Sequence, residues 1–154
     1  MREILFRGKT LLGNWVEGDL LQYLGYGKAH IVQHYKGAGG QEVVPATVGQ
    51  YTGLTDKNGK KIFEGDILHF KAYRGGGFAC PIGTDIYYKV LFGHCNPDRN
   101  TLSEYVGFWA LGKNYDEDDL YEYGNSINYL VDSHGAYVIG NIHDNSELLR
   151  SDTE

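Results

Sequence analysis

Apolar and polar residues alternate along much of this chain, which is the pattern expected of strands that bury one face in a sheet. The clearest case is Asp66–Tyr73, where Ile67 and His69 fall on one face and Leu68 and Phe70 on the other. Further segments predict strands because aromatic and β-branched residues are concentrated in them. They are Glu3–Arg7, Trp15–Tyr23, His30–Tyr35, Glu42–Val44, Thr47–Tyr51, Lys61–Phe63, Ile86–Phe92, Tyr105–Leu111 and Ala136–Ile142.

Glycine-rich breaks between these segments predict turns. Asn58-Gly59 is a strong turn signal because both residues tolerate positive φ. Lys36–Gly40 predicts the loop of a longer hairpin, and Pro45 ends the strand that follows it because proline lacks the amide hydrogen of a sheet ladder. We expect one structural motif of turns and strand entrances, made of Gly53, Asn58, Gly59, Glu64, Gly65 and Asp66.

Helical spacing is confined to the last third of the chain. Within Asn114–Leu130, apolar residues from Leu120 onward recur at intervals near 3.6 residues. The interruption at Gly124-Asn125-Ser126 favours one short helix followed by a loop, and Asn145–Arg150 predicts a single helical turn. Many short strands and few helices predict a mainly β protein of small antiparallel barrel- or sandwich-like units, with one or two short helices.

A short repeat bears on the domain organisation. Glu17–Tyr23 and Glu64–Phe70 are identical at four of seven positions, which is compatible with duplication of a small β unit or with coincidence. The length of 154 residues suits one domain over residues 1–154. Two intertwined β subdomains, about 1–77 and 78–154, are the alternative.

The charges are unevenly placed along the chain. Residues 1–77 hold 10 Lys/Arg against 7 Asp/Glu, a net +3, and residues 78–154 hold 4 against 13, a net −9. Asn114–Tyr123 alone carries five acids and no base. This distribution does not predict nonspecific phosphate binding, but it permits docking of one half on another surface.

Sequence templates for chemistry are missing. The histidines and the two cysteines lack the spacing of a zinc site, so we expect no metal, no cofactor and two reduced thiols. No nucleophile or phosphate-binding motif occurs, and we expect no catalytic residue. The alternative is an unrecognised enzyme that uses Glu64 and Asp66 as an acid–base pair.

The aromatic content points to binding. Thirteen Tyr and two Trp exceed what a core of this size takes, and aromatic surface is typical of protein–protein contacts. We expect a homo-oligomer or a protein partner. The alternative is nucleic-acid binding by a small barrel, through Lys57, Lys60, Lys61, Lys71 and Arg74. Without an apolar run of about 20 residues or a signal peptide, we expect a cytoplasmic protein that does not enter the membrane.

Three segments together resemble the YopX family of small proteins encoded by phages and prophages. They are Arg2–Lys9 with Trp15–Gly18, then Val48–Ile67, then Val138–Asn145 followed by Glu147-Leu148-Leu149. The resemblance implies a β-rich protein of a bacterial virus that acts in the host cytoplasm, with no catalytic residue to carry over. It implies nothing about residues 78–128. The leading hypothesis is therefore a non-enzymatic phage or prophage accessory protein that oligomerises and binds a phage or host macromolecule.

Overall fold

The computed structural model describes residues 1–23, 26–33, 39–96 and 105–150 of the chain. The chain divides into two compact units, Met1–Gly53 (unit 1) and Leu54–Glu154 (unit 2). The boundary considered near residue 77 falls inside unit 2, in the connection between β7 (Asp66–Lys71) and β8 (Asp85–Cys95). These two strands are hydrogen-bonded neighbours, which explains why the chain does not divide there.

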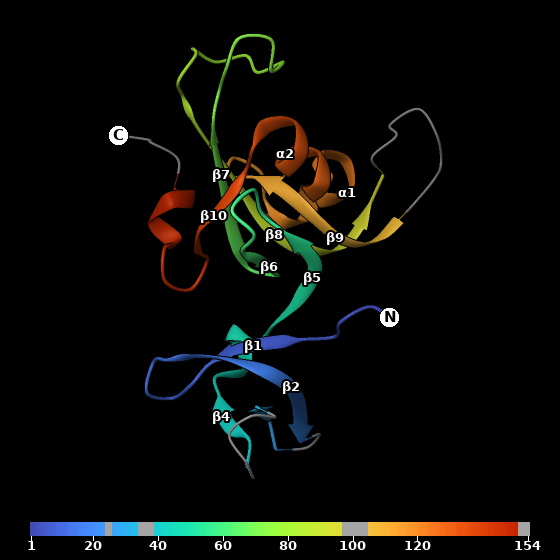
Figure 1. Cartoon of the computed structure of the whole chain (residues 1–154), viewed down its shortest axis with the longest axis vertical. Coiled ribbons are helices and arrows are strands. Elements are labelled where there is room, and N and C mark those ends of the chain that lie inside the picture. Colours follow the sequence, from blue (N-terminus) through green and yellow to red (C-terminus); the bar gives the residue numbers. More distant parts are fainter. Residues whose placement is uncertain (24–25, 34–38, 97–104, 151–154) are drawn as a thin grey trace. The chain divides into compact units, whose positions relative to one another are not determined.

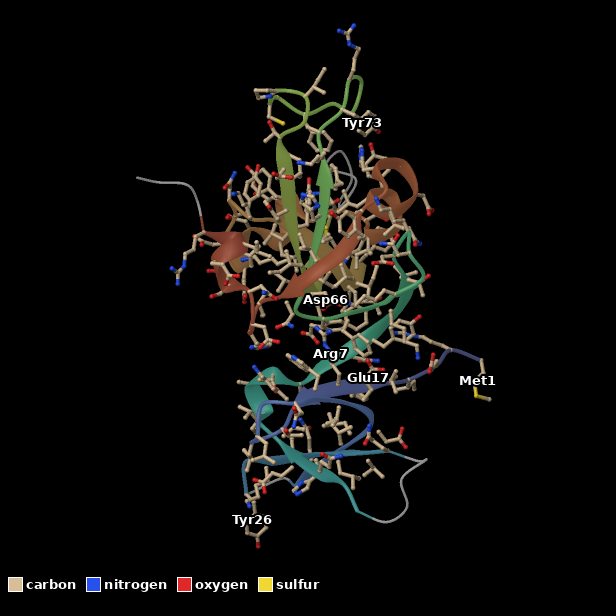
Figure 2. The ribbon with its side chains drawn as sticks, turned by 60° about the vertical axis from the view of Figure 1, so that its left-hand side comes forward. Met1, Arg7, Glu17, Tyr26, Asp66 and Tyr73 are labelled. Atoms are coloured by element: carbon tan, nitrogen blue, oxygen red, sulfur yellow. The ribbon has the colours of Figure 1, made fainter. Side chains whose placement is uncertain are left out.

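Unit 1 is built on an antiparallel sheet with the order β4-β3-β2-β1-β5 (blue to cyan in Figure 1). Its strands are β1 (Phe6–Lys9), β2 (Trp15–Tyr23), β3 (Lys28–Val32), β4 (Gln41–Val43) and β5 (Gly49–Thr55), with a 3-10 turn η1 (Pro45–Thr47) before β5. β5 continues past Gly53 into unit 2, where β6 (Lys61–Phe63) is its neighbour. Tyr26, at the β2–β3 connection, is 81% exposed and points away from the sheet (Figure 2).

The core of unit 1 is small. Four apolar side chains are buried in one cluster, Val16, Ala29, Ile31 and Val43, with Phe6, Leu20 and Val48 packed against it. β2 and β3 approach so closely that a Cβ on Gly18 would lie 2.1 Å from the carbonyl oxygen of Val32. Glycine at position 18 is therefore required by the backbone of the neighbouring strand.

Unit 2 contains the second antiparallel sheet, with the order β10-β7-β8-β9 (Figure 1). Its outer strands are β9 (Tyr105–Gly112) and β10 (Tyr137–Asn141). The connection between them holds a 3-10 turn η2 (Glu117–Asp119) and two short helices, α1 (Leu120–Tyr123) and α2 (Ile127–His134). A last 3-10 turn, η3 (Ser146–Leu149), follows β10.

Helix α2 covers one face of this sheet. The Ser126 side chain caps its first turn by accepting a hydrogen bond from the Tyr129 N–H, and Gly135 ends it in the left-handed conformation at φ 64°. Ile127 and Leu130 point into the core. The buried cluster joins the helix to five strands, β6 to β10, and consists of Ile62, Leu68, Phe70, Val90, Ala110, Ile127, Leu130, Ala136 and Val138.

The predicted mainly β fold with short helices is confirmed, and within the described residues neither sheet closes into a barrel. Two details differ from expectation. The 114–130 region forms two short helices instead of one, because Gly124 lies in extended backbone and Ser126 caps a new helix. β7 is buried on both faces and not on one, since Ile67 and His69 are covered as fully as Leu68.

The two similar heptamers have different structural roles. Gly18 lies inside β2 and Asp19 is exposed, whereas Gly65 precedes β7 at φ 84° and Asp66 is 1% exposed. The same three letters, Glu-Gly-Asp, therefore form the middle of one strand and a turn before another. This difference argues against a duplicated β unit.

Candidate functional site

The predicted motif at Asn58-Gly59 forms a turn that is fixed by the carboxylate of Asp56. The Oδ1 atom of Asp56 accepts hydrogen bonds from the backbone N–H of Asn58 (2.8 Å) and of Lys60 (2.9 Å), and its Oδ2 accepts from the N–H of Val138 (2.9 Å). Burial alone would raise the pKa of Asp56, but these three bonds, together with the charge of Lys60, hold that pKa below its usual value. Asp56 thus ties the β5–β6 turn to β10, across 82 residues of sequence.

The Glu64-Gly65-Asp66 motif is also a folding device. Gly65 turns the chain at φ 84°, donates to the carbonyl of Val90 and accepts from the N–H of Ile142. The buried Asp66 carboxylate accepts from the N–H of Phe63 at 2.8 Å. Gly53 lies in β5 at φ 86°, in a conformation that favours glycine.

The C-terminal segment Val138–Asn145, which the sequence predicts to resemble the YopX family, forms a tight turn around Asn141. The side-chain oxygen of Asn141 accepts from the N–H of His143 (2.9 Å) and of Asp144 (3.0 Å), and its amide donates to Asp144 Oδ2 (3.2 Å). A Cβ on Gly140 would lie 2.3 Å from Asn145 Oδ1, so the turn excludes a side chain there. All three sets of motif residues therefore shape the backbone.

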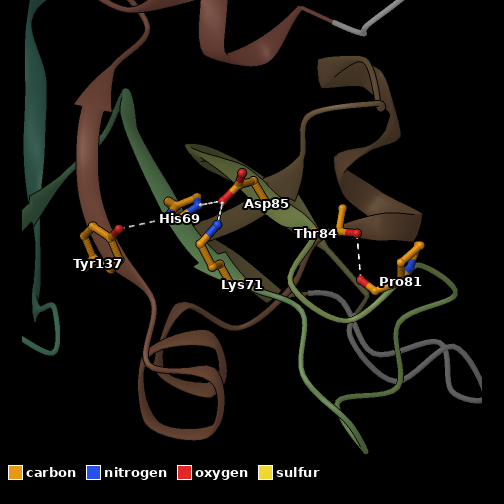
Figure 3. Close-up of polar contacts among 6 residues, drawn as sticks. All are labelled: His69, Lys71, Pro81, Thr84, Asp85 and Tyr137. Atoms are coloured by element: carbon orange, nitrogen blue, oxygen red, sulfur yellow. Dashed lines mark hydrogen bonds and ion pairs between the residues drawn. The ribbon is translucent and has the colours of Figure 1, made fainter.

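A polar network lies across three neighbouring strands of the second sheet (Figure 3). His69 on β7 lies opposite Tyr137 on β10 and opposite Tyr87 on β8. Its Nε2 lies 2.7 Å from Oδ1 of Asp85, and its Nδ1 lies 2.9 Å from the hydroxyl of Tyr137. The Nζ of Lys71 donates to the same Asp85 oxygen at 2.8 Å.

Asp85 is the charged centre of this network. Its hydrogen bonds with Lys71 and then with His69 lower the pKa of Asp85, and the bond with Asp85 raises the pKa of Lys71. Ionised Asp85 can only accept, so His69 Nε2–H donates this hydrogen bond, and Nδ1 and the Tyr137 hydroxyl form the other, whose direction depends on the tautomer. His69 is only 5% exposed, so its ring is closed to a substrate from solvent. The network therefore ties three neighbouring strands together through side-chain hydrogen bonds.

The sequence gives little indication of this network. His69 bonds to residues 16 and 68 positions later in the chain, and the alternation of β7 does not identify either of them. Beside the network, the Thr84 hydroxyl donates to the Pro81 carbonyl at 2.7 Å and closes the turn before β8 (Figure 3).

The five predicted nucleic-acid contacts are not one cluster of unengaged cations. Lys71 is paired with Asp85, and the Nζ of Lys57 lies 4.6 Å from the centre of the Tyr137 ring. The others lie in the turn before β6, at the start of β6 and in the loop after β7; they are Lys60, Lys61 and Arg74. In Figure 2, Tyr73, next to Arg74, and Asp66 mark opposite ends of the β7 segment. A nucleic-acid role for these cations stays a prediction.

Apolar side chains are exposed on β8 and β9 next to the part of the sheet that is buried. Val90 and Ala110 lie opposite each other in the core, whereas the next pair on the same face is Phe92 and Phe108, whose rings meet edge to face at 5.1 Å. Phe92 is 53% exposed and Val106 is 60% exposed. We call Phe92, Val106 and Phe108 the β8–β9 apolar surface.

A groove of about 340 Å³ borders this surface, and we call it the acidic groove. Its lining includes Phe92, Glu64, Glu117 and Asp118. Glu64 lies in the turn before β7, and Asp66, whose carboxylate is buried, does not line this groove. Glu64 and Asp66, the acid–base pair of the enzyme alternative, therefore lie in different environments.

Other chemistry is limited in the part of the chain that the structure describes. No group of three or more His, Cys, Asp and Glu side chains there is placed to hold a metal ion. Cys80 and Cys95 are free thiols, as expected. None of the described helices has the length and apolar character needed to cross a membrane.

Comparison with known proteins supports the sequence resemblance. Residues 5–77 match the model of the YopX protein family, and no curated protein matches the chain. The crystal structure of protein EF1440 from Enterococcus faecalis is similar to this chain at 20% identity and a TM-score of 0.48, over 97% of this chain and all of that one. The family match includes the Asn58-Gly59 turn and the Glu64-Gly65-Asp66 motif. The resemblance to the YopX family is therefore supported over residues 5–77.

Proposed function

We propose that this protein is a non-enzymatic accessory protein of a phage or prophage, which acts in the host cytoplasm by oligomerising and binding a macromolecular partner. The observation that carries the proposal is the β8–β9 apolar surface. Exposed, adjacent aromatic and aliphatic side chains on a rigid sheet are the usual core of a protein contact, and aromatic residues contribute most of its energy.

The chemistry of the chain supports binding over catalysis. The residues that resemble the family make backbone hydrogen bonds at turns, and the His69 ring is buried and hydrogen-bonded at both nitrogens. Glu64 and Asp66 occupy different environments, so the acid–base alternative has no shared site. The phage or prophage setting comes from the family resemblance.

Site-specific photo-crosslinking in bacterial cells tests the proposal. A photoreactive amino acid replaces Phe92 in one variant and Ile82, an apolar residue that is 66% exposed in a loop of the same unit, in the matched control. We expect position 92 to crosslink to a defined protein, to a second copy of this chain, or to both, and position 82 to do neither. Equal crosslinking from both positions, or none from position 92, would contradict the proposal.

A further inference from the structure

β9 is the edge strand of the second sheet, with β8 as its only sheet neighbour among the described strands. Successive residues of a strand direct their backbone N–H and C=O groups to opposite sides. Ala110 bonds through both groups to Asn125, on the side away from β8, at 2.9 and 2.7 Å. Val106 and Phe108 lie four and two residues earlier, so their backbone groups point to that same outer side.

The outer side is open at these two residues. Within residues 1–23, 26–33, 39–96 and 105–150, no backbone hydrogen bond reaches Val106 or Phe108 from that side. Among the described residues, Asn125 closes the edge at Ala110 and not at Val106 or Phe108. An open edge of this kind is a template onto which another strand can add.

Side chains beside the open edge supply apolar contacts. Val106 and Phe108 share a face of β9, and Phe92 lies opposite Phe108 on β8. A strand added along β9 would place alternate side chains over the β8–β9 apolar surface. The added segment therefore needs an apolar residue at every second position.

The charge of the surroundings selects among such segments. The acidic groove brings the carboxylates of Glu64, Glu117 and Asp118 next to Phe92. The decapeptide Asn114–Tyr123, which contributes Glu117 and Asp118, carries five acids and no base. A second copy of this edge would bring the same acids together and be repelled, whereas a segment with Lys or Arg would be attracted.

We propose that the outer edge of β9 binds an extended, positively charged segment of a partner protein by strand addition at Val106 and Phe108. This inference rests on the proposed binding function and specifies its partner. The segment alternates apolar residues, which lie on the β8–β9 apolar surface, with cationic residues that are attracted by the acidic groove.

Binding of synthetic peptides to the full chain tests this proposal. The probes are end-blocked octapeptides that alternate Lys with Val or Glu with Val, and fluorescence anisotropy measures their affinity. We expect the Lys-Val peptide to bind, more weakly as salt rises, and the Glu-Val peptide to bind at least tenfold more weakly, a difference of about 1.4 kcal/mol.

Substitutions at Val106 separate strand addition from general charge attraction. Val106→Pro removes the outward N–H without removing a bond to β8, and proline is tolerated at such edge positions. Val106→Thr, the matched control, keeps the N–H and the branched shape. We expect the proline variant to lose at least tenfold in affinity for the Lys-Val peptide and the threonine variant to bind as the parent does. If Val106→Pro does not fold, Val106→Lys replaces it, because a cation on the edge repels the cationic strand.

The outcomes distinguish this inference from the broader function. Unchanged binding of the Lys-Val peptide by a folded Val106→Pro variant overturns strand addition. Equal affinity for the two peptides would contradict the proposal that the partner segment is positively charged. A dimer of this chain that Val106→Pro abolishes would contradict it as well, because the added strand would then come from a second copy. If no peptide binds but position 92 still crosslinks to a partner, the inference fails while the proposed function stands; if position 92 also fails to crosslink, both are wrong.

Discussion

Unit 1 and unit 2 are both built on antiparallel sheets, but different interactions hold them together. Unit 1 has a cluster of four buried apolar residues, contributed by β2, β3 and β4. Unit 2 has a cluster of nine such residues, two of them on helix α2, and two buried carboxylates, Asp56 and Asp66, accept backbone hydrogen bonds there. In unit 2, hydrogen bonds from buried carboxylates to the backbone therefore add to the larger apolar core.

This difference between the units explains why turn motifs such as Asn58-Gly59 and Glu64-Gly65-Asp66 lie in unit 2. A small sheet with short connections is specified by its alternation and by close approaches such as that at Gly18. A sheet assembled from distant segments also needs fixed turns, because each turn sets which strands meet. The Asp56–Val138 bond joins the matched residues 5–77 to a strand outside them, so the motif acts beyond its own segment.

Truncating a core residue in each unit should produce the largest effects. Leu130 in unit 2 is 1% exposed and Ile31 in unit 1 is fully buried. We expect Leu130→Ala and Ile31→Ala each to cost about 2–5 kcal/mol. Amide hydrogen exchange should show lost protection in β7 and β8 for the first variant and in β2 and β3 for the second.

Leu12→Ala, at a position 89% exposed, is the control and should leave exchange unchanged. Equal loss of protection in both units from either core variant would show that the two units unfold as one.

Removing the Asp56 carboxylate should have the next largest effect. Asp56→Ala leaves the N–H groups of Val138, Asn58 and Lys60 without their acceptor, and we expect unit 2 to lose about 3 kcal/mol of unfolding free energy in urea. The pKa of Asp56 is lowered in the fold, so its contribution is present above the ordinary value of 3.8 and is lost as pH falls below it.

The difference between parent and Asp56→Ala should therefore shrink between about pH 7 and about pH 3. Asp56→Asn, which keeps one acceptor oxygen, should lie between the two. A difference that is the same at both pH values would mean that the carboxylate charge contributes nothing.

The two Glu-Gly-Asp triplets allow a direct test of the different roles of their glycines. Gly18→Ala forces a Cβ to 2.1 Å from the Val32 oxygen, and we expect a cost of about 2 kcal/mol. In Gly65→Ala, the new Cβ would lie 3.6 Å from Ile142, an ordinary contact distance. We therefore expect only the backbone strain of φ 84°, which costs about 1 kcal/mol of stability. Thermal unfolding of both variants checks the order, and the reverse order would restore the case for equivalent repeats.

The smallest effect concerns His134 at the end of α2. Its ring stacks on Phe70 at 5.0 Å, and burial lowers the pKa of His134 below 6.5. Because the unfolded chain takes up the proton first, this stabilising contribution is present above that value and is lost as pH falls through it. NMR titration should give a pKa below 6.5, and His134→Gln should flatten the decline of Tm between about pH 7 and about pH 5. A titration midpoint above 6.5 would contradict the burial.

Much of the fold could be predicted because its signals are local. The Asn58-Gly59 turn and the strands around it follow from residues next to each other in sequence. β1 begins at Phe6 and not at Glu3, because pairing with β2 and β5 decides where the ladder starts. The burial of β7 on both faces also depends on its neighbours, which its own alternation does not describe.

The sites depended on pairings that the sequence does not show. His69, Asp85 and Tyr137 meet only because β7 lies between β10 and β8. Likewise, Phe92 and Val106 were each recognisable as strand residues, but their place at an open edge required the strand order of the sheet.

The bond from Asp56 to Val138 also has a consequence for how the protein is made. During synthesis on a ribosome, all strands of unit 1 have left the exit tunnel long before β10 is translated. The second sheet cannot be completed at that stage, because one of its edges, β10, is translated after its other three strands. A nascent chain that ends before β10 would therefore present Asp56 and β7 without this neighbouring strand, and unit 2 can reach its native form only after β10 has been translated.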